Sequence, residues 1–408
     1  MYEKWQAFTR LKRKLGLFPA VGYAVKRLLS FTNNRDQIEL SKADIIDYYG
    51  FVVSKPFGMN AANTEGQATI NWVIPDFGVG SGGHLNIFRL VHGLEKQGFS
   101  CHVVIDGPCQ FSSAAAARKC IRTQFFPIEA EVSIGRESIP AAWATVATSW
   151  QTAYLVRDFQ ATQMKFYFVQ DFESYFYANS SESVFAEQTY NFGFHGITAG
   201  QWLADTLSSK YGMHTYPYGF SYDRDLYEPK QKKESATRHL FFYARPVTPR
   251  RGFELGMLVL NEVMRKVPNL EVIFAGWDIS GYEVNFPHVD AGIVPLKDLA
   301  DLYSQCDLAL VLSLTNVSLL PLELMASGCP VVSNSGANVE WLLNDSNTVL
   351  VKPNVKDLSE AIISLLEDNN RLQSLREAGL NFARSTSWDS EISRLVKYLG
   401  QLRHASST

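Results

Sequence analysis

The sequence predicts an α/β protein in which two domains, each built on a parallel sheet, face each other across a cleft. Three observations carry this prediction. The chain has 408 residues, which is enough for two domains. Short apolar runs alternate with helical stretches from residue 70 onward, as in parallel sheets covered by helices on both faces. The alternation stops in the polar, charged segment 222–238 and then begins again.

The composition excludes several classes of protein. Hydrophobic residues make up 46% and charged residues 19%, which permits a sizeable core and excludes wholesale disorder. The 38 Lys and Arg against 41 Asp and Glu give a net charge of −3, so we expect no nucleic-acid partner. The five cysteines contain no Cys-x-x-Cys pair, which argues against a disulfide scaffold or a zinc ribbon and fits a reducing cytoplasm.

The N-terminal segment 1–31 is basic, with seven Lys and Arg against one Glu. Its first 15 residues predict a helix with one apolar stripe, because apolar residues recur three or four positions apart (Trp5, Phe8, Leu11 and Leu15). Such a basic amphipathic extension can lie on an anionic membrane surface. The alternative is a helix that packs on the body of the protein. We therefore expect a cytoplasmic protein. If the basic helix binds a membrane, the protein is peripheral on the inner face of the plasma membrane.

The first domain is predicted over residues 1–225. A glycine-rich turn follows its first strand and precedes a helix over 84–97. The predicted strands of this domain are 71–75, 101–105, 144–148, 165–169 and 194–198.

The second domain is predicted over 226–386, after the boundary segment 228–234, which has no apolar periodicity and contains a proline. Its predicted strands are 239–244, 270–275, a short strand before Ile293, 308–312 and 330–333. Its predicted helices are 253–267, 296–305, 320–327, 355–368 and 370–384. Residues 387–408 are expected to form a helix that returns to the first domain. Ligands of such sheets bind beyond the carboxyl ends of the strands, so we expect the site between the domains.

The glycine-rich turn of the first domain is a candidate phosphate site. Gly78, Gly80 and Gly83 fit the pattern G-x-G-x-x-G, and Asp106 ends the next predicted strand. The free N–H groups of a helix start favour a phosphate, so Gly82, Gly83 and His84 are candidate ligands. The alternative is a tight turn that only packs the helix on the sheet.

Two arginines follow the first strand of the second domain. Arg245 ends that strand, and Arg250 precedes the next helix. A guanidinium group matches paired phosphate oxygens, so this turn is suited to a diphosphate. A basic loop in solvent is the alternative interpretation.

Two acidic residues complete the set of candidate site residues. Glu323 lies in the first turns of the predicted helix 320–327, where it can accept two hydrogen bonds from a ribose diol or merely complement the helix dipole. Asp171 follows the predicted strand 165–169, where it can orient an acceptor hydroxyl, compensate charge, or cap the next helix.

Several of these residues belong to sequence strings that resemble those of a known protein family. The Ser-Gly-Gly turn at 81–83, the Arg245-to-Gly252 turn and the string PLELMASGCPVV at 321–332 resemble GT-B glycosyltransferases, family 4 in particular. The strings FYARPVTPR (242–250), YFVQDFESYFY (167–177) and ITAGQWLADTL (197–207) are similar to the rhamnosyltransferases that build bacterial surface glycans.

The resemblance implies a retaining transfer of a 6-deoxyhexose, L-rhamnose from dTDP-L-rhamnose, to a growing, lipid-linked surface glycan. It implies that Arg245 and Arg250 hold the diphosphate and that Glu323 binds the donor ribose. With Asp171, which is a candidate because of its place after strand 165–169, the two arginines are expected to be catalytic. The implied donor ligands are Gly82, Gly83, His84, Arg245, Arg250, Ile293, Val294, Ser318, Leu319, Leu320 and Glu323. It also implies that no metal is required, because arginines and a helix N-terminus stabilise the leaving diphosphate.

The sequence departs from the E-x7-E motif of that family, because Thr315 stands where the first glutamate is usual and Ser318 where the glycine is usual. This departure favours an unusual donor, and it leaves open a UDP or GDP sugar or an inactive GT-B-like scaffold subunit. An NAD-dependent oxidoreductase and a sugar-nucleotide epimerase are further alternatives. The oxidoreductase leaves Arg245, Arg250 and Glu323 without a role.

Overall fold

The computed structural model describes residues 45–58 and 68–406. The chain divides into two units, Met1–Lys55 and Pro56–Thr408. The described part of the first unit is a short helix α3 (Ile45–Tyr48) and a 3-10 turn η1 (Gly50–Val52). The predicted amphipathic extension 1–31 lies outside the described residues. Among the helices that the model describes, none is long and apolar enough to cross a membrane.

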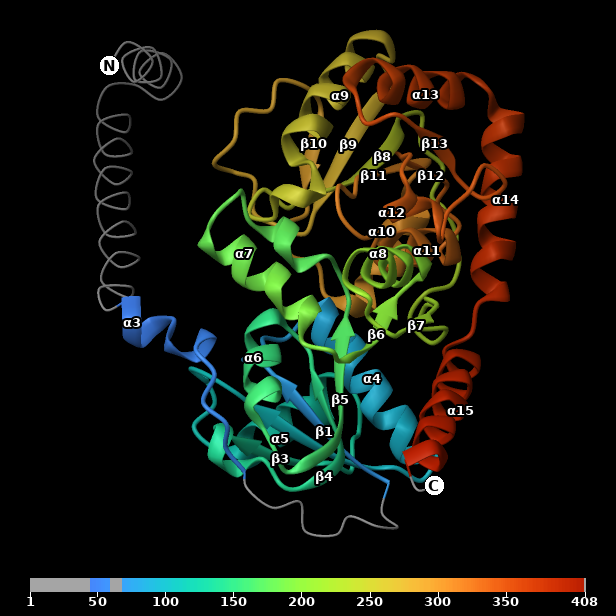
Figure 1. Ribbon diagram of the computed structural model, residues 1–408. Helices are drawn as coiled ribbons and strands as arrows, with labels where there is room; N and C mark the ends of the chain where they lie inside the picture. Colours follow the sequence, from blue (N-terminus) through green and yellow to red (C-terminus); the bar gives the residue numbers. More distant parts are fainter. Residues whose placement is uncertain (1–44, 59–67, 407–408) are drawn as a thin grey trace. The chain divides into compact units, whose positions relative to one another are not determined.

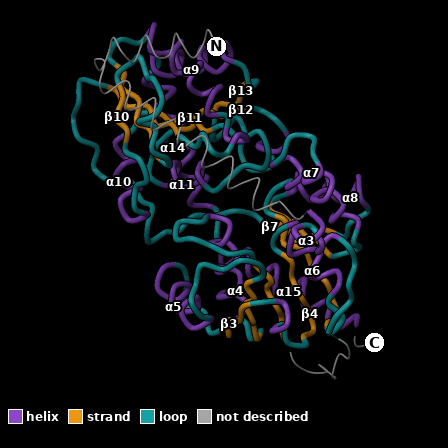
Figure 2. The backbone as a smooth tube through the Cα atoms, turned by 90° about the vertical axis from the view of Figure 1, so that its left-hand side faces the viewer, coloured by secondary structure: helices purple, strands orange, loops and turns teal. Residues whose placement is uncertain are grey.

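The second unit contains two parallel sheets, drawn as separate groups of strands in Figure 2. The N-terminal sheet has seven strands in the order β3-β2-β1-β4-β5-β6-β7. Their bounds are β1 (Thr69–Ile74), β2 (Ser100–Ile105), β3 (Glu131–Ile134), β4 (Ala142–Ala147), β5 (Thr162–Val169), β6 (His195–Ala199) and β7 (Thr215–Tyr218). The helices of this half are α4 (Gly82–Lys96), α5 (Ala114–Gln124), α6 (Trp150–Asp158), α7 (Ser181–Gln188) and α8 (Gln201–Tyr211). Short 3-10 turns are η2 (Arg136–Ser138), η3 (Glu173–Phe176) and η4 (Thr189–Asn191).

The C-terminal sheet has six strands in the order β10-β9-β8-β11-β12-β13. Their bounds are β8 (Arg238–Tyr243), β9 (Leu270–Ala275), β10 (His288–Asp290), β11 (Leu308–Val311), β12 (Val331–Asn334) and β13 (Val349–Val351). The 3-10 turn η5 (Pro249–Arg251) follows β8. The helices are α9 (Phe253–Lys266), α10 (Leu296–Gln305), α11 (Leu320–Ala326), α12 (Ala337–Glu340), α13 (Val355–Glu367) and α14 (Asn369–Ser385). The last helix, α15 (Trp388–Ser406), follows α14.

In both sheets, the direction in which successive strands are added to the sheet reverses at a central strand. In the N-terminal sheet β1 pairs with both β2 and β4, and in the C-terminal sheet β8 pairs with both β9 and β11. At such a point, the connections that follow two adjacent strands lead to opposite faces of the sheet. This separation opens a crevice at the carboxyl ends of the two strands. The topology therefore directs attention to the loops that follow β1, β8 and β11.

The central strands of the C-terminal sheet are buried on both faces. Successive strand residues point to opposite faces, so Phe241 of β8 packs in the large core that also contains the N-terminal sheet. Leu240 and Phe242 pack in a second core beneath α9 and α13. This double burial explains why the strands appear in the sequence as continuous apolar runs.

Helix α15 packs on the N-terminal half, beside α4 in Figure 1. The Glu391 carboxylate accepts a hydrogen bond from the Gly219 backbone N–H at 2.8 Å. The Tyr398 ring stacks on Tyr216 with centroids 4.6 Å apart. The chain therefore crosses between the two halves twice, once before β8 and once after α14.

The predicted fold class, two parallel-sheet α/β domains, is confirmed. The predicted strands of both domains are present, with ends shifted by at most three residues. Three strands were not predicted, namely β3, β7 and β13. The exact domain boundaries at 225 and 386 stay a prediction.

Candidate functional site

The predicted site residues lie in loops at the carboxyl ends of the strands. Gly82, Gly83 and His84 open the helix after β1, and Asp171 follows β5. Arg245 and Arg250 follow β8, and Ile293 and Val294 follow β10. The loop after β11 contains Ser318 and Leu319 and leads into α11 with Leu320 and Glu323.

The glycine turn fixes the ring of His84. His84 Nε2 lies 3.3 Å from the Pro75 carbonyl oxygen, and its Nδ1 lies 2.8 Å from Ser81 Oγ. A carbonyl only accepts, so Nε2 carries the proton and the Ser81 hydroxyl donates to Nδ1. Burial lowers the pKa of His84, which keeps the ring neutral. Beside it, a Cβ added at Gly82 would meet no heavy atom within 4 Å, so the start of α4 is open.

Gly83 connects this turn to the loop after β5. The Gln170 side chain donates from Nε2 to the Gly83 carbonyl oxygen at 3.1 Å. Its Oε1 accepts from Asn86 Nδ2 at 3.1 Å. The loop that contains Asp171 is therefore fastened to the start of α4.

Arg245 lies on an aromatic ring at the end of β8. Its guanidinium carbon is 5.3 Å from the centre of the Trp277 ring, and its Nη1 donates to the Gly276 carbonyl at 3.3 Å. The side chain is half-buried, so it can still reach an anionic ligand. Trp277 was not among the predicted residues, and nothing in the local sequence distinguishes it from a core tryptophan.

Arg250 is held by residues of the N-terminal half. Its guanidinium lies 4.0 Å from the centre of the Phe176 ring, and its Nε is 3.3 Å from Asp171 Oδ2. Phe176 belongs to η3 and Asp171 to the loop before it. The structure thus brings together Arg250 and Asp171, which the sequence singled out separately.

Asp171 is 7% exposed and has several partners. Its Oδ1 accepts from the backbone N–H groups of Phe172 and Asn316, both at 2.9 Å. Its Oδ2 accepts from the Thr315 hydroxyl at 2.9 Å, in addition to the ion pair with Arg250. Of the roles considered for Asp171, these contacts favour charge compensation.

The loop after β11 is buried against the N-terminal half. Asn316 Nδ2 donates to the backbone carbonyls of Gln170 at 3.0 Å and Ala199 at 2.8 Å. Its Oδ1 accepts from Trp341 Nε1 at 2.8 Å. The sequence did not single out Asn316, because its partners are 117 and 146 residues away along the chain.

Glu323 lies in a second set of charged groups. Burial and, less strongly, the charge of Asp223 raise the pKa of the Glu323 carboxyl to about 7, although a hydrogen bond from Tyr227 opposes the rise. Asp223 makes a two-pronged ion pair with Arg89 of α4, in which Arg89 Nη2 lies 2.8 Å from Asp223 Oδ2. The Arg89 guanidinium also lies 4.5 Å from the centre of the Trp388 ring. Arg89 and Tyr227 were not predicted, and no motif indicates them.

Asp223 belongs to the Asp-x-Asp triplet 223–225. From the sequence, no such triplet was expected at a position where a divalent ion would bridge the phosphates. Such triplets commonly hold a divalent ion against phosphates. Here the Asp223 carboxylate is bound by Arg89, and Asp225 is exposed. Within residues 45–58 and 68–406, no three His, Cys, Asp or Glu side chains gather in a way that would hold a metal ion.

Glu173 is a second buried acid near Arg250. Burial raises the pKa of the Glu173 carboxyl to about 7. Its Oε2 accepts a hydrogen bond from the backbone N–H of Trp150 at 2.8 Å, and its Oε1 accepts one from the Tyr167 hydroxyl at 3.0 Å. Because protein groups occupy both oxygens, Glu173 supports the loop after β5 and does not face a ligand.

The remaining predicted residues form the outer parts of the region. Ile293 is 76% exposed and Val294 is half-buried, in the loop between β10 and α10. Ser318 and Leu319 are half-buried before α11, and Leu320 is buried in its first turn.

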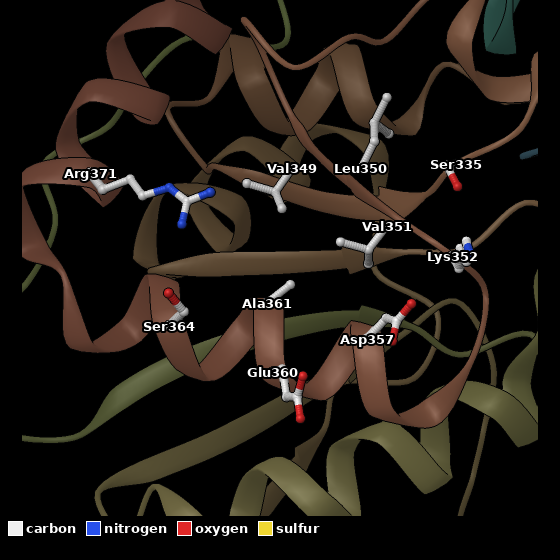
Figure 3. A pocket seen from close by; sticks show the side chains of 10 residues that line it. All are labelled: Ser335, Val349, Leu350, Val351, Lys352, Asp357, Glu360, Ala361, Ser364 and Arg371. Carbon is white, nitrogen blue, oxygen red and sulfur yellow. The ribbon is translucent and has the colours of Figure 1, made fainter.

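A cavity of about 520 Å³ lies elsewhere, between β13, α13 and α14 (Figure 3). Val349 and Val351 of β13 line it together with charged side chains, among them Glu360 and Arg371. None of the predicted site residues lines it. The candidate site is therefore defined by the loops at the strand ends and not by this cavity.

The chain matches known proteins in sequence. Residues 238–363 match the family described as WsaF, C-terminal domain. The O-antigen biosynthesis protein RfbC of Myxococcus xanthus is 32% identical over 361 residues, which cover 85% of this chain. The match covers 28% of the length of RfbC, so this chain corresponds to a part of that relative.

Solved structures match the fold across most of the chain. Sucrose-phosphate synthase of Thermosynechococcus elongatus superposes with a TM-score of 0.63 at 13% identity, covering 83% of this chain and all of that chain (100%). Anabaena HepE, solved in complex with UDP and glucose, has a TM-score of 0.62 at 14% identity, covering 82% of this chain and 100% of its own. The chain therefore has the two parallel-sheet α/β domains of the GT-B glycosyltransferase fold, and its C-terminal sheet lies within the match to the WsaF C-terminal domain.

Proposed function

We propose that the chain is a glycosyltransferase of surface-polysaccharide synthesis that uses a nucleotide diphosphate sugar as donor. The observation that carries the proposal is the pair of arginines, Arg245 and Arg250, beyond the strand β8 at which the sheet order reverses. Aromatic rings position both guanidinium groups, and charge-assisted bonds from such groups suit a leaving diphosphate. The GT-B fold, the match to an O-antigen biosynthesis protein and the UDP complex of a structural neighbour support it.

The finer proposal is a retaining transfer of L-rhamnose from dTDP-L-rhamnose to a glycan acceptor. The acceptor oxygen attacks the anomeric carbon on the face from which the diphosphate departs. The bond from that carbon to the phosphate oxygen breaks, and its electron pair stays on the phosphate. The acceptor proton passes to the leaving phosphate, so the reaction needs no protein nucleophile. Its support is the resemblance of residues 167–177, 197–207 and 242–250 to rhamnosyltransferases, and the replacement of the first motif glutamate by Thr315.

A donor panel tests the activity. The protein is incubated with dTDP-L-rhamnose, UDP-glucose or GDP-mannose and a short glycan acceptor, and products are identified by mass spectrometry. We expect a mass increase of one deoxyhexose with dTDP-L-rhamnose alone. A hexose product from another donor would overturn the finer proposal and retain the coarser one.

The variant Arg245→Ala tests the diphosphate site. Loss of one charge-assisted contact is expected to weaken nucleoside diphosphate binding about 10- to 100-fold, with the fold intact. Titration calorimetry measures the affinity. The matched control is Arg265→Ala, because Arg265 is an exposed arginine of α9 that pairs with Glu262. Equal affinity of the two variants would remove Arg245 from the site.

A GT-B-like binding or scaffold subunit is the second candidate. Thr315 favours it, because this residue replaces a motif glutamate and its hydroxyl is already bound to Asp171. The same titrations discriminate between the two candidates. A protein that binds dTDP, UDP and GDP equally poorly, and forms no product with any donor, would be the scaffold.

A further inference from the structure

Protein groups engage both oxygens of the Asp171 carboxylate. A carboxylate offers about four lone-pair positions. Three of those of Asp171 accept hydrogen bonds, from Phe172 N–H, Asn316 N–H and the Thr315 hydroxyl, and Arg250 adds an ion pair to Oδ2. The side chain is also 7% exposed, so an acceptor hydroxyl does not reach it without displacing one of these groups.

The guanidinium group of Arg250, in contrast to the Asp171 carboxylate, contacts protein groups over only a part of its surface. Its guanidinium lies over the Phe176 ring, and its Nε is 3.3 Å from Asp171 Oδ2 in an ion pair. Among the residues that the structure describes, the buried Nε has no hydrogen-bond partner, so the ion pair and the ring hold the group without a hydrogen bond. An arginine held in this way can turn its terminal N–H₂ groups toward a ligand as a fork, which is the geometry that pairs with phosphate oxygens.

The partners of Asp171 come from the opposite half of the molecule. Thr315 and Asn316 belong to the loop after β11, and Arg250 belongs to η5 after β8. Asp171 and Phe176 belong to the segment after β5 in the N-terminal half. The carboxylate therefore sits against residue 315, the position at which the family motif has a glutamate of its own.

We propose that Asp171 is a positioning residue and not a proton acceptor for the substrate. With Phe176 it orients Arg250 toward the donor diphosphate, and through Thr315 it fixes the loop after β11. It thereby supplies, from the first domain, the carboxylate that the second domain lacks at position 315. This inference rests on the proposed function, because it assigns a role within the same donor site.

The variant Asp171→Asn separates positioning from proton transfer. The amide keeps the shape and can still accept from the two backbone N–H groups, but it offers no charge to Arg250. Positioning predicts that the dissociation constant of the nucleoside diphosphate rises roughly ten- to a hundredfold. It also predicts that kcat at saturating donor stays within about tenfold of wild type, and that the pH dependence of kcat keeps its shape. A catalytic base predicts the reverse, an unchanged dissociation constant with kcat reduced by a factor of 1,000 or more and its acidic limb lost.

A pair of substitutions at Thr315 tests the same assignment without changing any charge. Thr315→Val removes the hydroxyl that donates to Asp171, whereas Thr315→Ser keeps it. We expect weaker nucleotide binding for the valine variant, in the same direction as Asp171→Asn, and near wild-type binding for the serine variant. This pair also decides the matter if Asp171→Asn does not fold, as judged by circular dichroism and thermal unfolding.

The outcomes separate this inference from the proposed function. A wild-type protein that binds no nucleoside diphosphate would overturn both. Wild-type binding that Asp171→Asn leaves unchanged would overturn the positioning role alone. Equal binding by the Thr315→Val and Thr315→Ser variants would exclude the contact with Thr315 from that role.

Discussion

We expect the protonation state of Glu323 to control how well the protein binds its donor. Its carboxyl is half-buried beside Asp223 and accepts a hydrogen bond from Tyr227. Burial raises its pKa to about 7, so the ionised form predominates only above that pH. A carboxylate accepts two hydrogen bonds from a ribose diol, whereas a protonated carboxyl is a poorer acceptor. We therefore expect Glu323 to bind a donor more tightly above pH 7 than below it.

We predict that the KM for the nucleotide sugar rises as the pH falls from 8 to 6. If the ionised form alone binds well, the ionised fraction and hence the affinity fall about tenfold at one pH unit below the pKa. The donor contributes no change of its own, because both phosphates of a sugar-linked diphosphate are esterified. Steady-state kinetics at several pH values provide the measurement.

The control for this prediction is Glu323→Gln, which keeps the shape but has no charge to lose. Its KM should be high and nearly independent of pH between 6 and 8. Glu173 also titrates near pH 7, and it remains in both proteins, so the difference between their profiles reports Glu323. Parallel profiles for the two proteins would show that Glu323 does not bind the donor.

At the scale of elements, the contact between α4 and α15 joins the glycine-turn helix to the end of the chain. Gly93 of α4 is buried beneath Ile392 of α15. A Cβ at Gly93 would lie 2.5 Å from Ile392 Cδ1 and 3.0 Å from both Cγ atoms. Because the whole isoleucine side chain is in the way, the two helices would have to move apart.

We predict that Gly93→Ala lowers the free energy of unfolding by about 1–3 kcal/mol, as overpacking in a core does. Gly400→Ala is the matched control, since Gly400 lies in α15 with no heavy atom within 4 Å of an added Cβ. That substitution should raise stability by about 0.5–1 kcal/mol, because alanine favours a helix over glycine. Denaturant unfolding measures both, and a stabilised Gly93→Ala variant would contradict the packing described.

The elements that the sequence did not predict share one property. β3 and β7 are the two edges of the N-terminal sheet, and β13 is an edge of the C-terminal sheet. A central strand is buried on both faces and appears as a continuous apolar run, whereas an edge strand is short and partly exposed. β7, with the sequence TYPY, even contains a proline. Their pairing partners, and not their own composition, make them strands.

The same distinction applies to the candidate site. Arg245, Arg250 and Glu323 could be found because each belongs to a local string of residues. The contact of Asp171 with Thr315 spans 144 positions, and the ion pair of Arg89 with Asp223 spans 134. No local pattern records such pairs, because only the folded chain brings segments so far apart in sequence into contact. The sequence thus indicated candidate donor-binding groups but not the contacts that hold them in place.

For the whole molecule, the two halves are joined by a buried polar contact. Asp171 and Asn316 connect the loops after β5 and β11, and both polar atoms of the Asn316 side chain have hydrogen-bond partners. A buried network of this kind is costly to break in part, because each separated group would be left without a partner. The arrangement of cations at the site therefore depends on both halves.

Fixed guanidinium groups lead to a prediction about metal dependence. We expect transfer to persist in excess EDTA, because Arg245 and Arg250 already supply the positive charge that a leaving diphosphate needs. Replacing both arginines with glutamine should lower kcat/KM by about 100- to 1,000-fold or more. Product formation with and without chelator provides the measurement. Complete loss in EDTA, restored by Mn²⁺ or Mg²⁺, would mean that a metal ion is the main electrophile.

The return of α15 to the N-terminal half has a consequence for the order of synthesis. A ribosome completes the strands of the first sheet early, and domains generally fold as they emerge. Trp388, Ile392 and Tyr398, which cover Arg89, Gly93 and Tyr216, are made only after the entire second sheet. The first sheet is therefore completed after the second one, and a nascent chain exposes one side of α4 until α15 has been made.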